Sequence, residues 1–276
     1  MIDGKVPKGV WDDLAGLYPT RDGHVRIHTN FPQLVSSILF FVFFVFFFKI
    51  VIFCSHRQGI LSLLQCEGTR SAVSEALLQQ NSVEFETAAT AAGMCVSAIR
   101  SFDEWDSHPQ SQVYKGRLPV ELIKIGDAPP KERKHSLLPL EGIKVLELTR
   151  VIAGPVAGRT LATNGADVLW ITSPKLHSLP VLDVDTSRGK RAAQLDLNES
   201  GSMEMLYSLI KTADVFLQSY RPGGLEERGL GPTDLARLNP GIIVANLRGY
   251  GWEGPWADKR AVSVYQCIFE ILFIEK

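Results

Sequence analysis

The second half of this 276-residue chain alternates short apolar runs with amphipathic stretches, and this alternation constrains the fold more than any other feature. The apolar runs predict strands at 144–148, 167–172, 193–197, 215–218 and 242–247. The stretches between them carry apolar residues at helical spacing and predict helices at 155–163, 199–212 and 232–238. Strands and helices that alternate in this way form a parallel, doubly wound sheet with right-handed crossovers. The predicted fold class is therefore α/β.

In such a sheet, ligands bind beyond the carboxyl ends of the strands, where loops meet helix N-termini. The loop after the first strand, Thr149–Pro155, contains Gly154 and is followed by Gly158. Glycines let backbone N–H groups approach an anion, and a helix N-terminus favours negative charge. The loop lacks the GxGxxG pattern, so a tight turn without a ligand explains it equally well.

Three further loops carry charged or aromatic residues. In residues 185–191, the cations Arg188, Lys190 and Arg191 surround a glycine, which suits a phosphate clamp or a solvated charge run. Residues 220–229 mix arginine with glycine, as a ligand loop or a simple turn would. Residues 249–256 place flat rings after the last strand, where aromatic packing under a loop is the plainer interpretation.

The first half predicts a small α+β domain. The turn residues Asp22-Gly23 lie between 17–18 and the alternating 25–28, which indicates a hairpin. Helical spacing follows at 60–64, 70–79, 82–92 and 102–105. The expected organisation is a small domain (1–32 and 56–124), an apolar insertion (33–55), a linker (125–138), a core (139–260) and an unrelated tail (261–276).

Composition excludes several classes of function. The 29 Lys and Arg residues nearly balance the 30 Asp and Glu residues, so no basic field favours nucleic acid. The four cysteines lie far apart without a CxxC pair, which predicts neither a metal site nor a disulfide framework, and a reducing compartment follows. No secretory or organellar presequence is recognised after Met1.

A phenylalanine-rich run is the anomaly of the sequence. Seven of the 14 Phe residues fall between Phe40 and Phe48, and the apolar run 38–54 has 17 residues, whereas a membrane helix needs about 20. Three interpretations stay open: a translated intron, a membrane span and a native buried helix. The intron is favoured, because T-rich codons encode these residues and GTAAGT can encode Val35-Ser36.

The block Leu140–Arg260 resembles the amino-terminal, Rossmann-like part of class III CoA-transferases, the CaiB/BaiF family, which also contains the α-methylacyl-CoA racemases. The matching pieces are Leu140–Thr149, Ala153–Pro155, Gly165–Val168, Ser187–Arg191 with Leu195–Leu197, Ala213–Val215, Arg221–Gly223, Asn239-Pro240, and Gly249–Gly251 with Gly254-Pro255. Residues 18–109 resemble the small domain that follows this core in the same family. A small domain placed before a core suggests a fused, two-copy parent protein that is truncated at both ends here.

The resemblance implies contacts with coenzyme A at residues in several loops. With Lys190 added from the charge pattern, the candidates are Arg150, Val151, Ile152, Lys190, Leu195, Asn198, Ser219, Tyr220, Arg228 and Arg260. Arg228 enters this set because the family commonly has arginine where this chain has Glu227. The implied ligand is CoA or an acyl-CoA, with no metal.

The implied family activity is transfer of CoA between an acyl-CoA and a carboxylic acid, with an aspartate nucleophile that follows the last matched segment. Residues 261–276 contain Glu270 and Glu275 but no Asp or His, so no catalytic residue is assigned and this chain is expected to be inactive. GTAAGT can also encode Val262-Ser263, which suggests a second translated intron. The alternatives are a member of the racemase branch, a non-catalytic CoA-binding or interaction protein, and a membrane-tethered protein.

The resemblance also implies partners and location. Family members form interlocked homodimers, and the substrates are an acyl-CoA and a small carboxylic acid. The expected location is the cytoplasm or a mitochondrial or peroxisomal matrix, with a membrane only if residues 38–54 span one.

Overall fold

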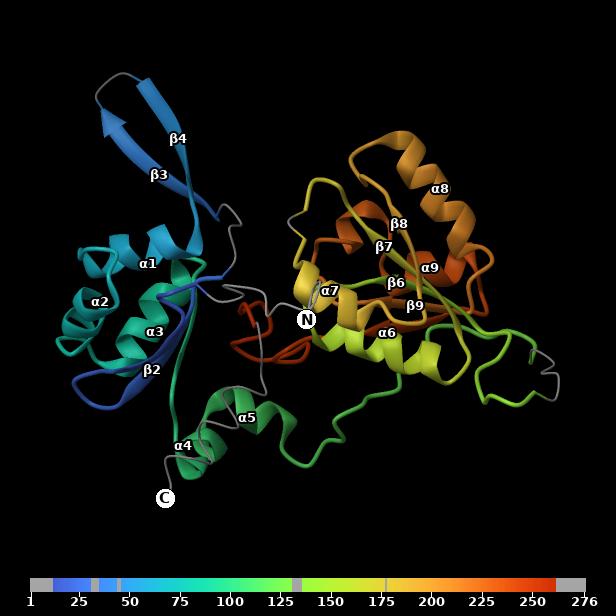
Figure 1. The fold of residues 1–276 in the computed structure, drawn as a ribbon, viewed down its shortest axis with the longest axis horizontal. Coiled ribbons are helices and arrows are strands. Elements are labelled where there is room, and N and C mark those ends of the chain that lie inside the picture. Colours follow the sequence, from blue (N-terminus) through green and yellow to red (C-terminus); the bar gives the residue numbers. More distant parts are fainter. Residues whose placement is uncertain (1–11, 31–34, 44–45, 131–135, 177, 262–276) are drawn as a thin grey trace, which may run out of the picture. The chain divides into compact units, whose positions relative to one another are not determined.

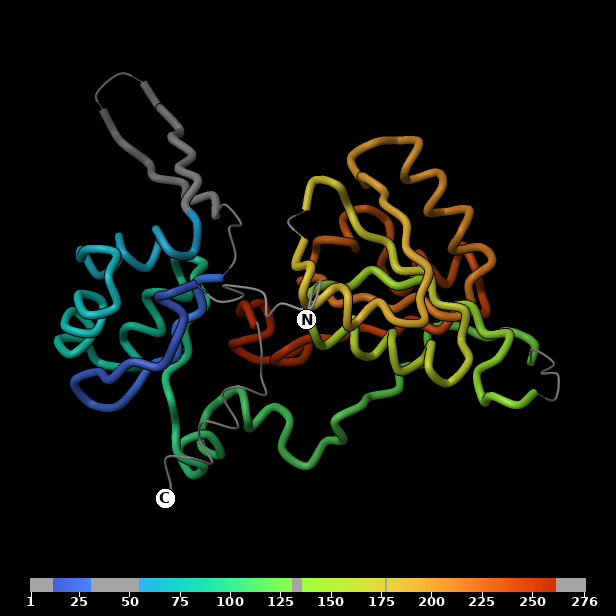
Figure 2. The backbone as a smooth tube through the Cα atoms, viewed as in Figure 1, coloured from blue at the N-terminus to red at the C-terminus, as the bar shows by residue number. Residues whose placement is uncertain are grey.

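The computed structural model describes residues 12–30, 35–43, 46–130, 136–176 and 178–261. Contacts divide the chain into a first unit, Met1–Val113 with Glu253–Lys276, and a second unit, Tyr114–Trp252. Figure 2 traces the described residues in colour from blue to red. Residues 253–260 therefore group with the first unit and not with the sheet of the second half, where the sequence pattern placed them.

The second unit is built on a five-stranded sheet (Figure 1). Its strands are β6 (Lys144–Leu148), β7 (Asp167–Thr172), β8 (Arg191–Gln194), β9 (Val215–Gln218) and β10 (Ile243–Asn246). They pair in parallel in the order β10-β9-β6-β7-β8. The predicted parallel α/β sheet is confirmed.

Helices cover both faces of this sheet. They are α6 (Ala153–Thr163), α7 (Pro180–Thr186), α8 (Ser200–Ile210) and α9 (Pro232–Leu238), with a 3-10 turn η1 (Glu226–Arg228) before α9. On one face, Phe216 packs with Leu206 of α8 and Leu235 of α9. On the other face, Leu217 and its neighbours pack against α6. Burial of each large apolar side chain contributes about 1.5–3 kcal/mol, so both faces need their helices.

The segment between β7 and β8 differs from the prediction. The strand expected at 193–197 begins at Arg191 and ends at Gln194, and the seven-residue helix α7 was not predicted. A helix in this connection returns the chain to the amino end of the sheet. Residues 187–190 therefore precede β8, and this loop does not belong to the carboxyl edge where ligands of such sheets bind.

The first unit contains the predicted small α+β domain. Its antiparallel sheet has the order β1 (Gly16–Pro19), β2 (His24–His28) and β5 (Cys95–Ala98). Its helices are α1 (His56–Leu64), α2 (Arg70–Leu77), α3 (Ser82–Ala91), α4 (Phe102–Ser107) and α5 (Pro109–Tyr114). Helices α1 and α4 begin at capping boxes, in which a serine side chain and the side chain three residues later satisfy each other's backbone N–H groups.

The phenylalanine-rich run forms two antiparallel strands, β3 (Val35–Phe43) and β4 (Phe46–Cys54), paired from Val35 with Cys54 to Phe43 with Phe46. Phe, Val and Ile favour strands, which accounts for this conformation. The run is therefore not helical in this structure, whereas two of its interpretations, a membrane span and a buried helix, predicted a helix. In the part of the chain that the structure describes, no helix is both long and apolar enough to cross a membrane. Translation of an intron stays a prediction.

Candidate functional site at the carboxyl edge of the parallel sheet

The strand order creates a switch point in the second unit. The chain starts in the central strand β6, adds β7 and β8 on one side, and then adds β9 and β10 on the other. The loops that follow β6 and β9 therefore leave the same edge of the sheet as direct neighbours. In open α/β sheets, this is the position where ligands bind.

The loop after β6 has a defined and strained conformation. The Oγ1 atom of Thr149 donates a hydrogen bond of 2.5 Å to Oε1 of Glu147, and Nε1 of Trp170 donates one of 3.1 Å to the Thr149 carbonyl oxygen. Val151 has a φ of 71°, which a β-branched residue rarely adopts. Strain of this kind persists only where the surrounding contacts enforce it.

Helix α6 begins directly against both loops. A Cβ atom added to Gly154 would lie 2.6 Å from Cβ of Thr149 and 2.9 Å from Oγ of Ser219, so only glycine allows this approach. Ile152 precedes the helix and supplies no side-chain cap, which leaves the N–H groups of Ala153 and Gly154 without that partner, while Pro155 has no N–H. A helix N-terminus without a side-chain cap favours an anion.

Arg150 and Tyr220 bring charge and a hydroxyl group to the same place. Burial raises the pKa of the Tyr220 phenol, and the positive charge of Arg150 opposes this effect. Arg150 follows β6 and Tyr220 follows β9, so the pair lies at the switch point. Five of the predicted residues meet there: Arg150, Val151, Ile152, Ser219 and Tyr220.

A second group joins the loops after β8 and β9. The guanidinium of Arg228 donates to the Leu197 carbonyl oxygen at 2.7 Å and to Oδ1 of Asn198 at 2.9 Å. The predicted residues Arg228 and Asn198 are therefore in direct contact. Leu195 packs against the apolar core that also contains residues of α8, so its side chain stabilises the loop. Whether these three residues contact CoA remains a proposal.

Lys190 does not have the environment that its charge pattern predicted. Its Nζ atom lies 2.7 Å from Oε2 of Glu147, and neither side chain is exposed to solvent. The same ammonium donates 2.8 Å hydrogen bonds to Oε1 of Glu147 and to the Pro155 carbonyl oxygen. The ammonium thus has two hydrogen-bond acceptors inside the protein and is fully buried, so a phosphate clamp at Lys190 does not fit this structure.

Arg260, the last of the predicted residues, belongs to the first unit. One of its guanidinium nitrogens lies 3.3 Å from Nε2 of His56, and its carbonyl oxygen accepts from Sγ of Cys95 at 3.8 Å. Its role in CoA binding therefore stays a prediction.

Sequence reasoning missed Arg248, which lies two residues after the end of β10 at the same edge of the sheet. Its guanidinium lies 3.4 Å from the centre of the Trp252 ring and 3.5 Å from Oε1 of Glu226. The signal was available, because Arg248 follows the last strand as Arg150 follows the first. Among the residues with described positions, no group of three or more His, Cys, Asp and Glu side chains could hold a metal ion.

Comparison with known proteins identifies a matching family and several relatives. Residues 140–268 match the model of CoA-transferase family III. The probable fatty acyl-CoA transferase Rv3272 of Mycobacterium tuberculosis is 35% identical over 139 residues, which cover 46% of this chain and 35% of the relative. The acetyl-coenzyme A transferase nodX of Hypoxylon pulicicidum is 41% identical over 125 residues, which cover 44% of this chain and 21% of the relative.

An acyl-CoA transferase of Gibberella moniliformis is similar over a longer stretch. It is 32% identical over 201 residues, which cover 68% of this chain and 35% of the relative. A stretch of that length includes residues that precede the five-stranded sheet. The chain spans about a third or less of the length of these three relatives.

Proposed function

This chain belongs to CoA-transferase family III through residues 140–268, and we propose that the carboxyl edge of its five-stranded sheet binds the phosphate-bearing, nucleotide part of coenzyme A. The observation that carries the proposal is that Arg150 and Tyr220 follow two neighbouring strands at the switch point, where the N-terminus of α6 also begins. A cation, a hydroxyl group and backbone N–H groups are together suited to a phosphate.

In this proposal, each residue at the carboxyl edge makes a different kind of interaction with CoA. The guanidinium of Arg150 supplies charge-assisted hydrogen bonds, and the first turn of α6 adds its N–H groups and the positive end of its dipole. Ser219 and Tyr220 supply hydroxyl groups from the neighbouring loop. Arg248, held over the Trp252 ring, adds a second positive charge at the same edge.

At the level of the family, the proposed activity is transfer of CoA from an acyl-CoA to a carboxylic acid. The three relatives are named as transferases of fatty acyl-CoA, acetyl-CoA and acyl-CoA. The family match and these names support an acyl-CoA substrate for this chain.

The 276-residue chain itself is proposed to bind CoA without transferring it. The family resemblance implies a nucleophilic aspartate that forms an anhydride with the acyl group, and the residues proposed to bind CoA at this edge include no aspartate. Binding without turnover is therefore the outcome to test first.

Calorimetric titration of CoA into the purified chain tests the site. Arg150→Ala should weaken binding about 10- to 100-fold, because a hydrogen bond to a charged group contributes about 1.5–3 kcal/mol. The matched control is Arg188→Ala, since that side chain is 73% exposed and lies in the loop before β8. The control should bind within twofold of the wild type. A folded wild type that does not bind CoA, or equal losses in both variants, would contradict the proposal.

A further inference from the structure

A fully buried ion pair lies beneath the loop that carries Arg150. Glu147 is in β6, two residues before Thr149, and Lys190 reaches it from the segment before β8. The exposed fraction of both side chains is 0%. Sequence reasoning assigned no role to Glu147 and a different role to Lys190.

Stabilisation of the fold is by itself a weak explanation for the buried ion pair between Glu147 and Lys190. Removal of two charges from water costs several kcal/mol for each ion, and apolar residues of similar volume often stabilise a protein equally well or better. Burial raises the pKa of Glu147 and lowers the pKa of Lys190, and the contact between them only opposes these effects. Because burial of this ion pair costs free energy, its presence must be explained by the other residues that it contacts.

The ion pair is hydrogen-bonded to both ends of the loop Thr149–Pro155. The Glu147 carboxylate accepts a hydrogen bond from the hydroxyl group of Thr149, at the start of the loop. The Lys190 ammonium donates to the carbonyl oxygen of Pro155, in the first turn of α6. Between these two anchors lie Arg150 and the strained Val151. The ion pair thus fixes the distance and direction between the end of β6 and the start of α6.

We propose that Glu147 and Lys190 are positioning residues, which hold the loop Thr149–Pro155 in the conformation that presents Arg150 and the N-terminus of α6 to the phosphates of CoA. This inference rests on the proposed function for its ligand. Its effect on the conformation of the loop can be measured without any ligand.

The decisive variants are Lys190→Met and the double variant Glu147→Leu/Lys190→Met. The single variant leaves a carboxylate buried without its cation, whereas the double variant removes both charges and keeps an apolar volume. We therefore expect the double variant to fold even if the single variant does not. The matched control is Arg191→Met, because Arg191 forms an ion pair with Asp167 on the neighbouring strand but makes no hydrogen bond to the loop.

The first measurement is amide hydrogen exchange of Val156 in the ligand-free protein, because its N–H donates a 2.8 Å hydrogen bond to the carbonyl oxygen of Ile152 in the loop. Both variants at position 190 should exchange this amide at least tenfold faster than the wild type, while Arg191→Met leaves it unchanged. Wild-type exchange in the folded double variant would overturn the inference, because the pair would then serve packing alone.

The second measurement is CoA affinity in combination with Arg150→Ala. The double variant should bind CoA about tenfold more weakly in the wild-type background and less than twofold more weakly once Arg150 is absent. Equal losses in the two backgrounds would show that the pair does not act through Arg150, and would overturn the inference. Absence of CoA binding in the wild type would instead overturn the proposed function. The exchange experiment would still test the role of the ion pair, because it uses no ligand.

Discussion

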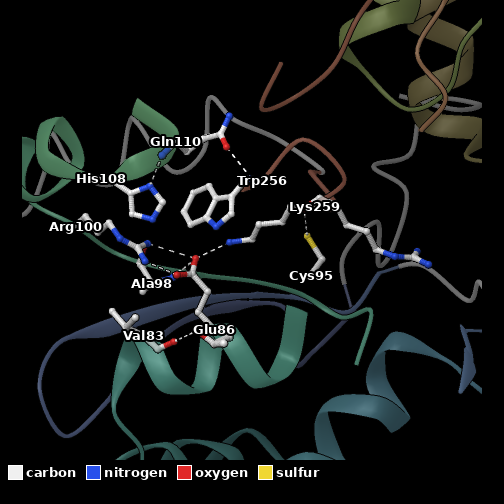
Figure 3. Close-up of polar contacts among 11 residues, drawn as sticks. Val83, Glu86, Cys95, Ala98, Arg100, His108, Gln110, Trp256 and Lys259 are labelled. Carbon is white, nitrogen blue, oxygen red and sulfur yellow. Dashed lines mark hydrogen bonds and ion pairs between the residues drawn. The ribbon is translucent and has the colours of Figure 1, made fainter. Parts of the chain in front are cut away.

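The ammonium of Lys259 lies 2.6 Å from a carboxylate oxygen of Glu86, although 173 positions separate the two residues. The guanidinium of Arg100 forms a second ion pair with the same carboxylate, and the indole ring of Trp256 lies near both cations, 3.7 Å from Lys259 and 5.2 Å from Arg100 (Figure 3). This cluster fastens residues 253–261 to α3 and β5 within the first unit.

The Glu86 cluster gives the first prediction. Burial alone would raise the pKa of Glu86, but the hydrogen bonds and charges of Arg100 and Lys259 outweigh it and lower that pKa. Glu86→Gln leaves two buried cations facing each other without an anion. We expect the free energy of unfolding to fall by about 3–5 kcal/mol, as measured by urea denaturation.

Glu84→Gln is the control for this experiment, because Glu84 lies exposed in the first turn of the same helix. Its effect should stay within about 0.5 kcal/mol. A loss of stability in Glu86→Gln that is no larger than in the control would show that the cluster does not hold the segment.

His28 gives the second prediction, which concerns acid stability. Burial, with smaller contributions from the charges of Arg26 and His56, lowers the pKa of His28 from 6.5 to about 4. The unfolded chain therefore binds a proton at a higher pH than the native protein does. Stability should fall by about 3 kcal/mol as the pH decreases from 6.5 to 4, because each pKa unit corresponds to about 1.4 kcal/mol.

Chemical denaturation at a series of pH values checks this expectation. His28→Gln should remove most of the decrease, whereas His24→Gln, at the start of the same strand, should keep it. Parallel pH profiles for the wild type and His28→Gln would refute the assignment.

The helices and strands that the sequence predicted correctly share one property. Each is a dense run of apolar residues bounded by residues that end helices and strands. Strands β6, β7 and β9 and helix α9 have the predicted bounds, because Gly, Pro or Asp residues flank each of them. Strand β5, Cys-Val-Ser-Ala, was missed because its pattern is weak. Its position depends on pairing with β2, which lies far away in the sequence.

The candidate site was predictable to the level of loops but not of side chains. The doubly wound pattern correctly placed Arg150 and Tyr220 at the carboxyl edge, since that follows from strand direction alone. Lys190 was assigned to a phosphate because a charge run gives no information about burial. Only the unpredicted helix α7, which returns the chain to the amino end of the sheet, shows how Lys190 reaches Glu147.

Gly158 gives the third prediction. A Cβ atom at this position in α6 would overlap the carboxylate of Glu147. Gly158→Ala should therefore lower the free energy of unfolding by several kcal/mol, because either the helix or the buried carboxylate must move. The control is Gly201→Ala in α8, where an added Cβ meets no atom within 4 Å.

In the control, replacement of a helical glycine should leave stability unchanged or raise it by up to about 1 kcal/mol. Thermal unfolding followed by circular dichroism distinguishes the two variants. Equal midpoints would show that the contact between α6 and β6 is looser than the structure indicates.

The fourth prediction concerns the pH dependence of Lys190→Met. Burial already raises the pKa of Glu147 in the presence of Lys190, and removal of the ammonium takes away the interactions that lower it. In the variant, native Glu147 therefore keeps its proton to a higher pH than unfolded Glu147 does. Because the native state then binds more protons than the unfolded state, stability must decrease as the pH rises.

The expected slope is a loss of up to about 1.4 kcal/mol for each pH unit above about 4.5, until native Glu147 ionises. Urea denaturation of Lys190→Met between pH 5 and 8 measures this slope. Glu147→Gln in the same background should abolish it, since the amide cannot ionise, and Arg191→Met should show no such loss. If the stability of Lys190→Met has the same pH profile as that of the wild type, water or a rearranged cation reaches Glu147. The carboxylate would then be more accessible to solvent than its burial against α6 indicates.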